Sequence, residues 1–270
     1  MNLYDTIGDG YATTRRADAR IVQALRDALG LAPGATIADI GAGTGNYSRA
    51  LADAGAFTVY AIEPSPVMRA QAPSHPRVHY LDAGAAPIPL PDRAVDGVVS
   101  TLAIHHFPDL AGAFREMARI TTPAAPMVLY TFDVGDAESG PAGERFWLED
   151  YFPSFYTDTQ RTFPPLAAVA ATLAATTGRT VTTIPFPLPH DLTDLCLAAG
   201  WRRPDLYLEP QVRAGISSFA LGDPDAIASG LERLRQDRES GVWEQRYGHL
   251  RTRDSFDAGY RLLCARAASV

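Results

Sequence analysis

The sequence predicts an α/β protein built on a doubly wound, mostly parallel sheet of seven strands. Short strands rich in Val, Ile and Ala alternate with helical segments, and a run of glycines follows the first of these strands directly. Strands that alternate with helices form parallel sheets, and apolar strands are typical of sheets buried on both faces. In such sheets ligands bind beyond the carboxyl ends of the strands.

The order of the expected elements follows from hydrophobic spacing. Ile21, Leu25 and Leu29 recur at helical spacing within 17–29, and Pro33-Gly34 ends that helix. Seven strands are expected at 36–40, 57–62, 78–81, 94–100, 127–132, 180–186 and 259–265, with helices at 46–54, around 110–117 and at 167–177. The stretch 190–256 is predicted to be a largely helical insertion before the last strand.

Composition excludes several classes of protein. Apolar residues make up 46% and charged residues 20% of the 270 residues, which excludes a disordered or collagen-like chain. All 24 basic residues are arginine, which excludes a lysine Schiff base, a lysine general base and a P-loop lysine. The net charge of −7 disfavours a nucleic-acid partner. No apolar run approaches the roughly 18 residues of a membrane-spanning helix.

The two cysteines bear on the compartment. Cys196 and Cys264 lack CxxC spacing and are too few for a disulfide framework. The first ten residues are polar and do not resemble a secretion signal. We therefore expect a cytoplasmic protein with free thiols and no membrane partner, either a monomer or a homodimer.

A glycine-rich loop joins the first expected strand to its helix. Residues 39–46 are Asp-Ile-Gly-Ala-Gly-Thr-Gly-Asn, and glycines let a backbone turn tightly and approach a ligand. The glycines fall as GxGxG, whereas the dinucleotide fingerprint GxGxxG requires glycine where Asn46 stands. Asp39 would repel a pyrophosphate but suits a cationic ligand such as an ammonium. A nicotinamide-dependent oxidoreductase is therefore the disfavoured alternative.

Two further acids close the next two expected strands. Glu63 ends the second strand, where an acid accepts hydrogen bonds from ribose hydroxyls. Asp82 ends the third strand, where a carboxylate can accept from an adenine amino group while the Ala83 backbone contacts the ring. Together with Asp39, these acids suit a ligand that carries a ribose, an adenine, an ammonium and a sulfonium. That ligand is S-adenosyl-L-methionine.

Residues 37–132 resemble a class I S-adenosylmethionine-dependent methyltransferase of the small-molecule branch typified by ubiquinone and menaquinone biosynthesis enzymes. Four motifs occur in order: Asp-Ile-Gly-Ala-Gly-Thr-Gly at 39–45, Ala-Ile-Glu-Pro-Ser at 61–65, Leu-Asp-Ala-Gly-Ala at 81–85, and Ala-Val-Asp-Gly-Val-Val-Ser-Thr-Leu-Ala-Ile-His-His-Phe at 94–107. The resemblance implies a Rossmann-like fold and methyl transfer to an O, N, S or C nucleophile of a small molecule. The alternative is a catalytically idle protein that binds the cofactor.

The resemblance also implies an organisation and a cofactor site. Residues 1–34 would form a helical cap, residues 35–134 the cofactor-binding core, and residues 135–270 a lid, the insertion and the closing strands of the same domain. In this branch the N-terminal segment often covers the cofactor, with an aromatic near the sulfonium and an arginine on the methionine carboxylate. The predicted cofactor residues are Tyr11, Arg15, Asp39, Gly41, Ala42, Gly43, Gly45, Asn46, Glu63, Pro64, Met68, Asp82, Ala83, Ser100, Thr101 and Leu102.

Two adjacent histidines follow the fourth expected strand, close to where the methyl group is expected. His105 and His106 are candidate catalytic bases, because an imidazole is the natural base near neutral pH. Two adjacent side chains are not expected to point inward together, so one of them would pack or cap the next helix. Neither histidine has the CxxC or HExxH spacing of a zinc site, so no metal is predicted.

An aromatic-rich segment over 146–163 is predicted to be a lid over the acceptor substrate. The alternative is packing beneath a long loop. The predicted walls of the substrate pocket are Tyr4, Trp147, Tyr151, Phe152 and Tyr156, with the two histidines at its floor. Such a lining favours a compact, partly apolar or aromatic molecule over a charged polymer.

Overall fold

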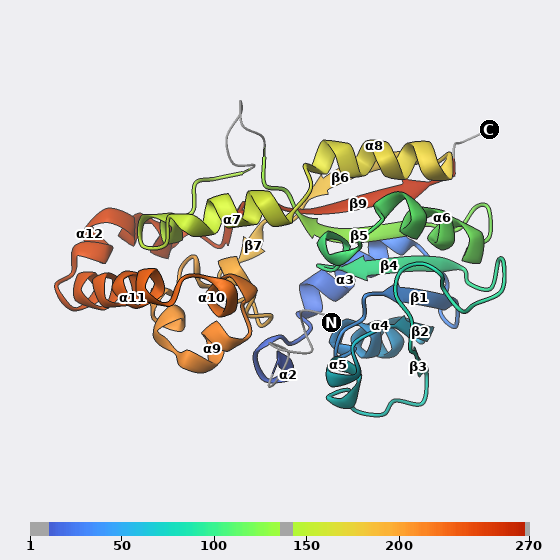
Figure 1. Ribbon diagram of the computed structural model, residues 1–270, viewed down its shortest axis with the longest axis horizontal. Coiled ribbons are helices and arrows are strands. Elements are labelled where there is room, and N and C mark those ends of the chain that lie inside the picture. The colour runs from blue at the N-terminus through green and yellow to red at the C-terminus, as the bar shows by residue number, and fades with distance from the viewer. Residues whose placement is uncertain (1–10, 136–142, 268–270) are drawn as a thin grey trace.

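A computed structural model describes residues 11–135 and 143–267, and its centre is a seven-stranded sheet (Figure 1). The strand order is β3-β2-β1-β4-β5-β9-β6. The five strands β1 to β5 pair in parallel, and β9 runs antiparallel to both β5 and β6. The strands are β1 (Thr36–Ile40), β2 (Thr58–Ile62), β3 (Val78–Leu81), β4 (Gly97–Thr101), β5 (Met127–Phe132), β6 (Thr180–Pro185) and β9 (Tyr260–Arg266). The fold class predicted from the sequence is confirmed.

The fourth strand begins later than its apolar pattern predicts. Asp96 already lies outside the strand, because its carboxylate accepts a hydrogen bond from the Thr36 backbone N–H at 2.9 Å. Val95 forms an isolated parallel bridge with Thr121. These contacts fix the entrance of β4 beside β1.

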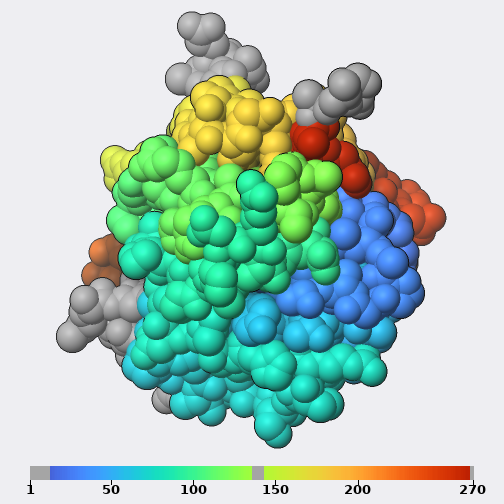
Figure 2. Space-filling model, turned by 90° about the vertical axis from the view of Figure 1, so that its right-hand side faces the viewer, coloured from blue at the N-terminus to red at the C-terminus, as the bar shows by residue number. Residues whose placement is uncertain are grey.

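Helices cover both faces of the sheet, and alternating strand residues point to each side. One face packs against α3 (Ala19–Leu29) and α4 (Asn46–Gly55), and the other against α6 (Leu110–Ile120) and α8 (Leu166–Thr177). Ile37 and Val99 join the first apolar cluster, while Ala38 and Val98 join the second. In Figure 2 the yellow residues of α8 lie at the top of the molecule and the blue residues that include α3 lie at the right. The short helix α5 (Pro66–Ala70) follows β2.

A helical lobe extends beyond one end of the sheet (Figure 1). Its helices are α7 (Ser154–Thr162), α9 (Pro210–Ala214), α10 (Ser217–Leu221), α11 (Pro224–Glu239) and α12 (Val242–Tyr247), with 3₁₀ turns η2 (Trp147–Asp150), η3 (Leu197–Gly200), η4 (Pro204–Leu208) and η5 (Gly248–Thr252). A two-stranded ribbon of β7 (Leu188–Pro189) and β8 (Ser255–Phe256) connects the lobe to the sheet. The apolar interior of the lobe is continuous with the first face of the sheet.

The N-terminal segment reaches from the sheet to the lobe. It contains α2 (Tyr11–Thr14) and α3, and Arg15 forms an isolated antiparallel bridge with Asp194 of the lobe. No helix within the described residues is both long and apolar enough to cross a membrane.

Candidate functional site

A cavity lies at the carboxyl ends of β1, β2 and β4, where the sequence predicts the cofactor; we call it the cofactor cavity. Arg15, Gly41, Ala42, Gly43, Thr44, Asn46, Tyr47, Glu63, Pro64, Met68, Ala83, Gly84, Ala85, Thr101, Leu102, Ala103, His106, Phe107, Pro108 and Asp194 line it. The four sequence motifs therefore meet around one space, because the carboxyl ends of parallel strands share one edge of a sheet.

The glycine loop forms the floor of the cofactor cavity through a left-handed backbone. Gly41 and Gly43 have φ angles of 74° and 57°, which side chains other than glycine seldom adopt. A Cβ on Gly41 would stand 2.5 Å from the Ala103 Cβ, and one on Gly43 would stand 3.2 Å from the Met68 Cε. Gly45 does not line the cavity. A Cβ there would collide with the Tyr80 hydroxyl at 1.5 Å, so this glycine is required for packing.

Glu63 is held in place by the loops on either side of it. Its carboxylate accepts hydrogen bonds from the backbone N–H groups of Gly43 and Ser65, each at 2.8 Å. These contacts fix a buried carboxylate in the wall of the cofactor cavity. A carboxylate fixed at the end of the second strand can accept hydrogen bonds from a ribose diol.

Asp39 lies behind the glycine loop and does not line the cofactor cavity. Its Oδ2 accepts a hydrogen bond from the Ser48 hydroxyl at 2.6 Å, and its Oδ1 is buried without a partner. Burial, with a smaller contribution from the charge of Glu63, raises the pKa of Asp39 to about 6, although the hydrogen bond from Ser48 opposes the shift. The structure therefore does not bring Asp39 to the position expected for the partner of a cofactor ammonium.

Asp82 and Ser100, two other residues predicted to bind the cofactor, also do not line the cofactor cavity. The exposed carboxylate of Asp82 is paired with the Arg69 guanidinium at 2.9 Å and 2.7 Å. The Ser100 hydroxyl is buried and donates to the Ile40 carbonyl at 2.7 Å, which ties β4 to β1. The neighbours of these residues, Ala83 and Thr101, do line the cavity.

A second cavity, which we call the acceptor cavity, adjoins the first and reaches into the lobe. Arg15, Leu102, His105, Phe132, Asp133, Val134, Glu144, Phe146, Leu148, Glu149, Phe155, Tyr156, Thr159, Phe163, Cys196, Leu197, Ala198, Ile216, Ser217, Ser218, Ala258 and Tyr260 line it. Arg15 and Leu102 line both cavities, so the two spaces meet at these residues.

Leu102 has an unusual backbone at this meeting point. Its φ angle is 51°, in the left-handed region that a branched side chain seldom adopts. Its N–H donates to the Tyr130 carbonyl at 2.7 Å, which holds this conformation in place. Strained backbone of this kind is typical of functional sites, where it directs particular side chains.

The two histidines divide between the two cavities. They belong to the 3₁₀ turn η1 (Ile104–His106), and His105 lines the acceptor cavity while His106 lines the cofactor cavity. The expectation that they would not both point inward is therefore wrong, because a tight turn directs adjacent side chains to different spaces. Their rings lie 3.9 Å apart, and the His105 ring stacks on Phe163 at 3.9 Å.

Both imidazoles are held in the neutral form. Burial, followed by the charges of His106 and Arg15, lowers the pKa of His105 well below its ordinary value. Burial also lowers the pKa of His106. The Nδ1 of His105 is buried without a hydrogen-bond partner. Within the described ranges, no three side chains of His, Cys, Asp or Glu gather in a way that would hold a metal ion.

Most of the aromatic residues predicted to form the walls of the substrate pocket belong to the hydrophobic core instead. The Trp147 indole N–H donates to the Trp201 carbonyl at 2.7 Å, and the Tyr151 hydroxyl donates to Asp237 at 2.7 Å. Phe152 packs between other rings. All three of these predicted wall residues are buried and none lines either cavity, so Tyr156 is the one predicted wall residue among those described that lines the acceptor cavity. Three other aromatics of the segment, Phe146, Phe155 and Phe163, line it as well. Tyr4 and the side chain of Tyr11 lie outside the described residues.

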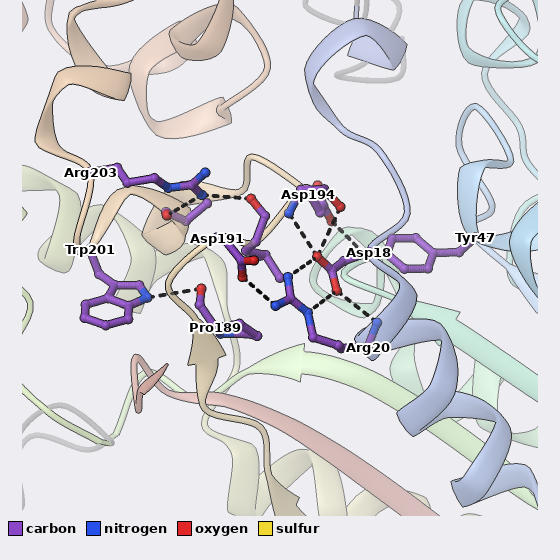
Figure 3. Close-up of polar contacts among 11 residues, drawn as sticks. Asp18, Arg20, Tyr47, Pro189, Asp191, Asp194, Trp201 and Arg203 are labelled. Carbon is purple, nitrogen blue, oxygen red and sulfur yellow. Dashed lines mark hydrogen bonds and ion pairs between the residues drawn. The ribbon is translucent and has the colours of Figure 1, made fainter. Parts of the chain in front are cut away.

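Asp194 is a site residue that the sequence analysis missed. It comes from the lobe segment after β7 and lines the cofactor cavity together with Arg15. Figure 3 shows this segment meeting the N-terminal segment near Asp18 and Arg20, with Tyr47 of α4 beside Asp194. No motif marks Asp194, because it is one of several acids in an irregular stretch; only the contact with Arg15 identifies it.

The cofactor cavity suits S-adenosylmethionine. A buried hydroxyl without a partner, Thr101 Oγ1, lies in its wall, and the unpartnered Asp39 Oδ1 lies directly behind its floor. Glu63 offers a fixed acceptor for a ribose, and Pro64 and Met68 offer an apolar surface for a purine. Added side chains at Gly41 or Gly43 would meet neighbouring atoms of this wall.

Comparisons with known proteins agree with this geometry. The Methyltransferase domain family matches residues 38–129. A crystal structure described as a methyltransferase from an antibiotic biosynthesis pathway of Anabaena variabilis is 49% identical and has a TM-score of 0.88, covering 93% of this chain and 98% of that one. A demethylmenaquinone methyltransferase of Corynebacterium urealyticum is 30% identical over 48% of this chain and 58% of that protein.

A third relative has a different acceptor. A malonyl-[acyl-carrier protein] O-methyltransferase of Serratia marcescens is 33% identical over 42% of this chain and 47% of that protein. The matched region thus spans about half the length of these curated relatives. The family match over residues 38–129 includes the four cofactor motifs and leaves out the lobe, which lines the acceptor cavity.

Proposed function

The chain belongs to the class I S-adenosylmethionine-dependent methyltransferases, and from that premise we propose that it methylates a compact, partly apolar small molecule. The observation that carries this proposal is the junction of the two cavities at Arg15 and Leu102. A molecule in the acceptor cavity would face the cofactor across that junction. Its body would lie against apolar and aromatic side chains, as is usual in small-molecule sites.

Residues of the core would hold the cofactor in extended form along the sheet edge. Glu63 would take the ribose hydroxyls, while Met68 and the 83–85 loop would enclose the adenine. S-adenosylmethionine carries a sulfonium, which makes its methyl group electrophilic without further activation. The protein therefore contributes mainly by positioning the acceptor atom in line with that methyl and by excluding water.

His105 would receive the proton that an O–H, N–H or S–H acceptor loses on methylation. Its ring lines the acceptor cavity, its Nδ1 has no partner, and its lowered pKa keeps the ring neutral and able to accept. The stack on Phe163 fixes the plane of the ring. His106 faces the cofactor cavity and has no such access to the acceptor.

The charges around the acceptor cavity favour neutral or cationic acceptors. Asp133, Glu144 and Glu149 line it, and Arg15 is the one arginine among the lining residues described. Arg15 is paired with Asp194 at 2.5 Å, so its charge is already balanced. Glu144 is likewise paired with Arg253 at 2.5 Å, whereas Asp133 and Glu149 form no ion pair within the described residues. An anionic acceptor would be repelled by these two carboxylates, which disfavours its binding.

The proposed activity is tested by supplying S-adenosylmethionine and fractions of a bacterial metabolite extract, and by measuring S-adenosylhomocysteine. We expect product from fractions of small, neutral or basic compounds. Gly43→Ala serves as the inactive control, because its Cβ would narrow the cofactor cavity. If no fraction yields product above that control, the protein is a catalytically idle cofactor binder.

The role of His105 is tested with His105→Gln and the matched variant His106→Gln. Loss of a general base typically lowers kcat by about 100-fold or more, so His105→Gln should show such a fall while S-adenosylhomocysteine still binds normally. His106→Gln should keep most of its turnover. Unchanged turnover in both variants would show that neither ring takes part in proton transfer and that positioning alone drives the reaction.

A further inference from the structure

An ion pair between the N-terminal segment and the lobe stands in the wall of the cofactor cavity. The Arg15 guanidinium donates to Asp194 through Nε at 2.5 Å and through Nη2 at 3.3 Å. The Asp194 side chain is 1% exposed and that of Arg15 is 14% exposed. A buried pair of this kind is weak evidence of stabilisation, because removing two charges from water is costly. Its place in a ligand cavity suggests a further role.

Three segments of the chain fix the position of Asp194. The Tyr47 hydroxyl of α4 donates to its Oδ2 at 2.9 Å. The backbone of the next residue, Leu195, donates to the Thr14 carbonyl at 3.2 Å, and the Asn46 amide donates to the Arg15 carbonyl. The ion pair is therefore held against the amino-terminal end of α4 by the core, the N-terminal segment and the lobe together.

The order of groups along the sheet edge places this pair at one end of the cofactor. Glu63 follows β2 and the 83–85 loop follows β3, so the ribose and adenine positions lie on the β2–β3 side. Arg15 and Asp194 lie at the other end, beside Tyr47. S-adenosylmethionine extends from its adenosine to an α-amino-acid group, which carries one carboxylate and one ammonium.

We propose that Asp194 of the lobe serves the ammonium of the cofactor's α-amino-acid group, beside Arg15, whose place on the carboxylate of that group the family resemblance already implies. A zwitterion carries both charges within a few bonds, and a buried pair of opposite charges matches it while keeping the subsite neutral overall. Asp39, the acid expected for the ammonium, lies behind the loop. The amino-terminal end of α4 adds a positive partial charge for the carboxylate.

This assignment makes the lobe part of the cofactor site, since Asp194 belongs to the lobe while Gly43 and Glu63 belong to the core. Arg15 also lines the acceptor cavity. Binding of the amino-acid group would therefore hold the N-terminal segment and the lobe against the core at the junction of the cavities. The inference rests on the proposed function, because it assumes that the cofactor binds in this cavity.

A calorimetric test compares three ligands that carry different parts of the cofactor. S-adenosylhomocysteine carries the complete amino-acid group, and 4-(5′-adenosylthio)butanoate lacks only the ammonium. 5′-Methylthioadenosine lacks the whole group. Each is titrated into wild type, Asp194→Asn, and the control Asp191→Asn. Asp191 lies on the same segment but is exposed and pairs with Arg20 outside the cavity.

We expect Asp194→Asn to weaken S-adenosylhomocysteine binding by at least about 10-fold, in line with loss of a buried hydrogen bond to a charged group. Binding of 5′-methylthioadenosine should not change, which would show that the variant is folded. Wild type should prefer S-adenosylhomocysteine over the deaminated analogue, and Asp194→Asn should lose that preference. Asp191→Asn should behave as wild type.

A double variant, Arg15→Gln/Asp194→Asn, removes both charges so that none is left buried without a partner. It too should bind 5′-methylthioadenosine normally and lose the preference for the ammonium. If Asp194→Asn keeps the wild-type preference for S-adenosylhomocysteine over the deaminated analogue, the inference is overturned and the proposed function stands. If wild type binds none of the three ligands, the proposed function itself is wrong.

Discussion

Gly43 shows at the scale of one residue how backbone geometry shapes the cofactor cavity. Its φ angle is 57°, and a Cβ would stand 3.2 Å from the Met68 Cε in the cavity wall. Gly34 also has a positive φ, 89°, but no heavy atom lies within 4 Å of its added Cβ. The two glycines therefore share the backbone constraint and differ in their surroundings.

The matched pair Gly43→Ala and Gly34→Ala separates these effects. Each variant should lose about 1 kcal/mol of stability from the left-handed backbone. Only Gly43→Ala should also weaken S-adenosylhomocysteine binding, because its Cβ narrows the cavity. Chemical denaturation gives the first quantity and calorimetry the second. Equal affinities in the two variants would contradict the assignment of the glycine loop to the cofactor.

The burial of Asp39 makes the folding stability of the protein depend on pH. Its pKa in the folded protein is about 6, above the ordinary value of 3.8. The unfolded chain therefore releases this proton at lower pH than the folded one, and the stability that the protonated group contributes is lost as pH rises through about 6. Ionised Asp39 thus opposes folding at neutral pH.

Asp39→Asn should remove the free-energy cost of burying an ionised carboxylate at neutral pH. In the absence of cofactor, the variant should be more stable than wild type at pH 7.5, by at most about 3 kcal/mol. The difference should shrink as pH falls toward 5, where Asp39 is already mostly protonated in wild type. Denaturant midpoints measured across this range test the expectation. A constant difference at every pH would show that the carboxylate does not titrate in this way.

At the scale of elements, the start of α3 depends on one buried acid. Asp18 caps the helix by accepting from the Arg20 backbone N–H at 2.9 Å, and it accepts from the backbone N–H of Thr193 in the lobe at 2.9 Å. Burial raises the pKa of Asp18, but hydrogen bonds from Arg20 and Thr193 outweigh this and hold the pKa well below its usual range. Its contribution to stability is present at neutral pH and lost on acidification.

Asp18→Ala should therefore cost about 3 kcal/mol, because it removes a helix cap and also the hydrogen bonds that the buried carboxylate accepts from the Arg20 guanidinium and the Thr193 N–H. The matched variant is Asp109→Ala, which removes the exposed cap of α6, where Asp109 accepts from Gly112 at 2.9 Å. That change should cost only about 1 kcal/mol. Unfolding in denaturant compares the two, and equal losses would refute the bridging role of Asp18.

The aromatic segment shows why three of the predicted wall residues, Trp147, Tyr151 and Phe152, are core residues instead. Its residues form η2 and α7, and their rings fill the interior that the lobe shares with Trp201, Tyr207 and Trp243. A cluster of aromatics is equally compatible with a ligand pocket and with a core. The choice depends on which helices pack against it, and those helices lie far along the chain.

At the scale of the whole molecule, several exposed arginines of the lobe are already paired with acids. Arg238 pairs with Asp205 at 2.8 Å, Arg246 with Asp150 at 2.8 Å, and Arg251 with Glu244 at 2.6 Å. Some of these guanidinium groups also lie over aromatic rings. Arginines engaged in this way have little capacity to displace counterions from a phosphate backbone.

The protein should therefore not retain nucleic acid at physiological salt. A gel-shift titration with transfer RNA should show no complex at micromolar protein, since the net charge of −7 opposes binding as well. Asp205→Asn, which frees Arg238 from one partner, serves as a comparison. Tight binding by wild type would contradict the proposal of a small-molecule acceptor.

Much of the fold was predictable because its signals are local. The central strands of the sheet are short, largely apolar runs bounded by turn residues, and the carboxyl ends of β1, β2 and β4 share one edge by topology. The glycine loop and Glu63 could therefore be placed around one ligand before any coordinates. Asp82 stands at the predicted strand end, but its carboxylate is paired with Arg69 and does not line the cofactor cavity.

The sequence by itself determined the class of fold, the family and the half of the site formed by the strand ends, because these depend on residues close to one another along the chain. Only the tertiary structure decided which histidine lines which cavity, which aromatics are core, and which acid pairs with Arg15. Arg15 and Asp194 are 179 residues apart. A contact between residues so far apart in the sequence depends on how the lobe packs against the core. The spacing of hydrophobic residues along the chain does not predict that packing.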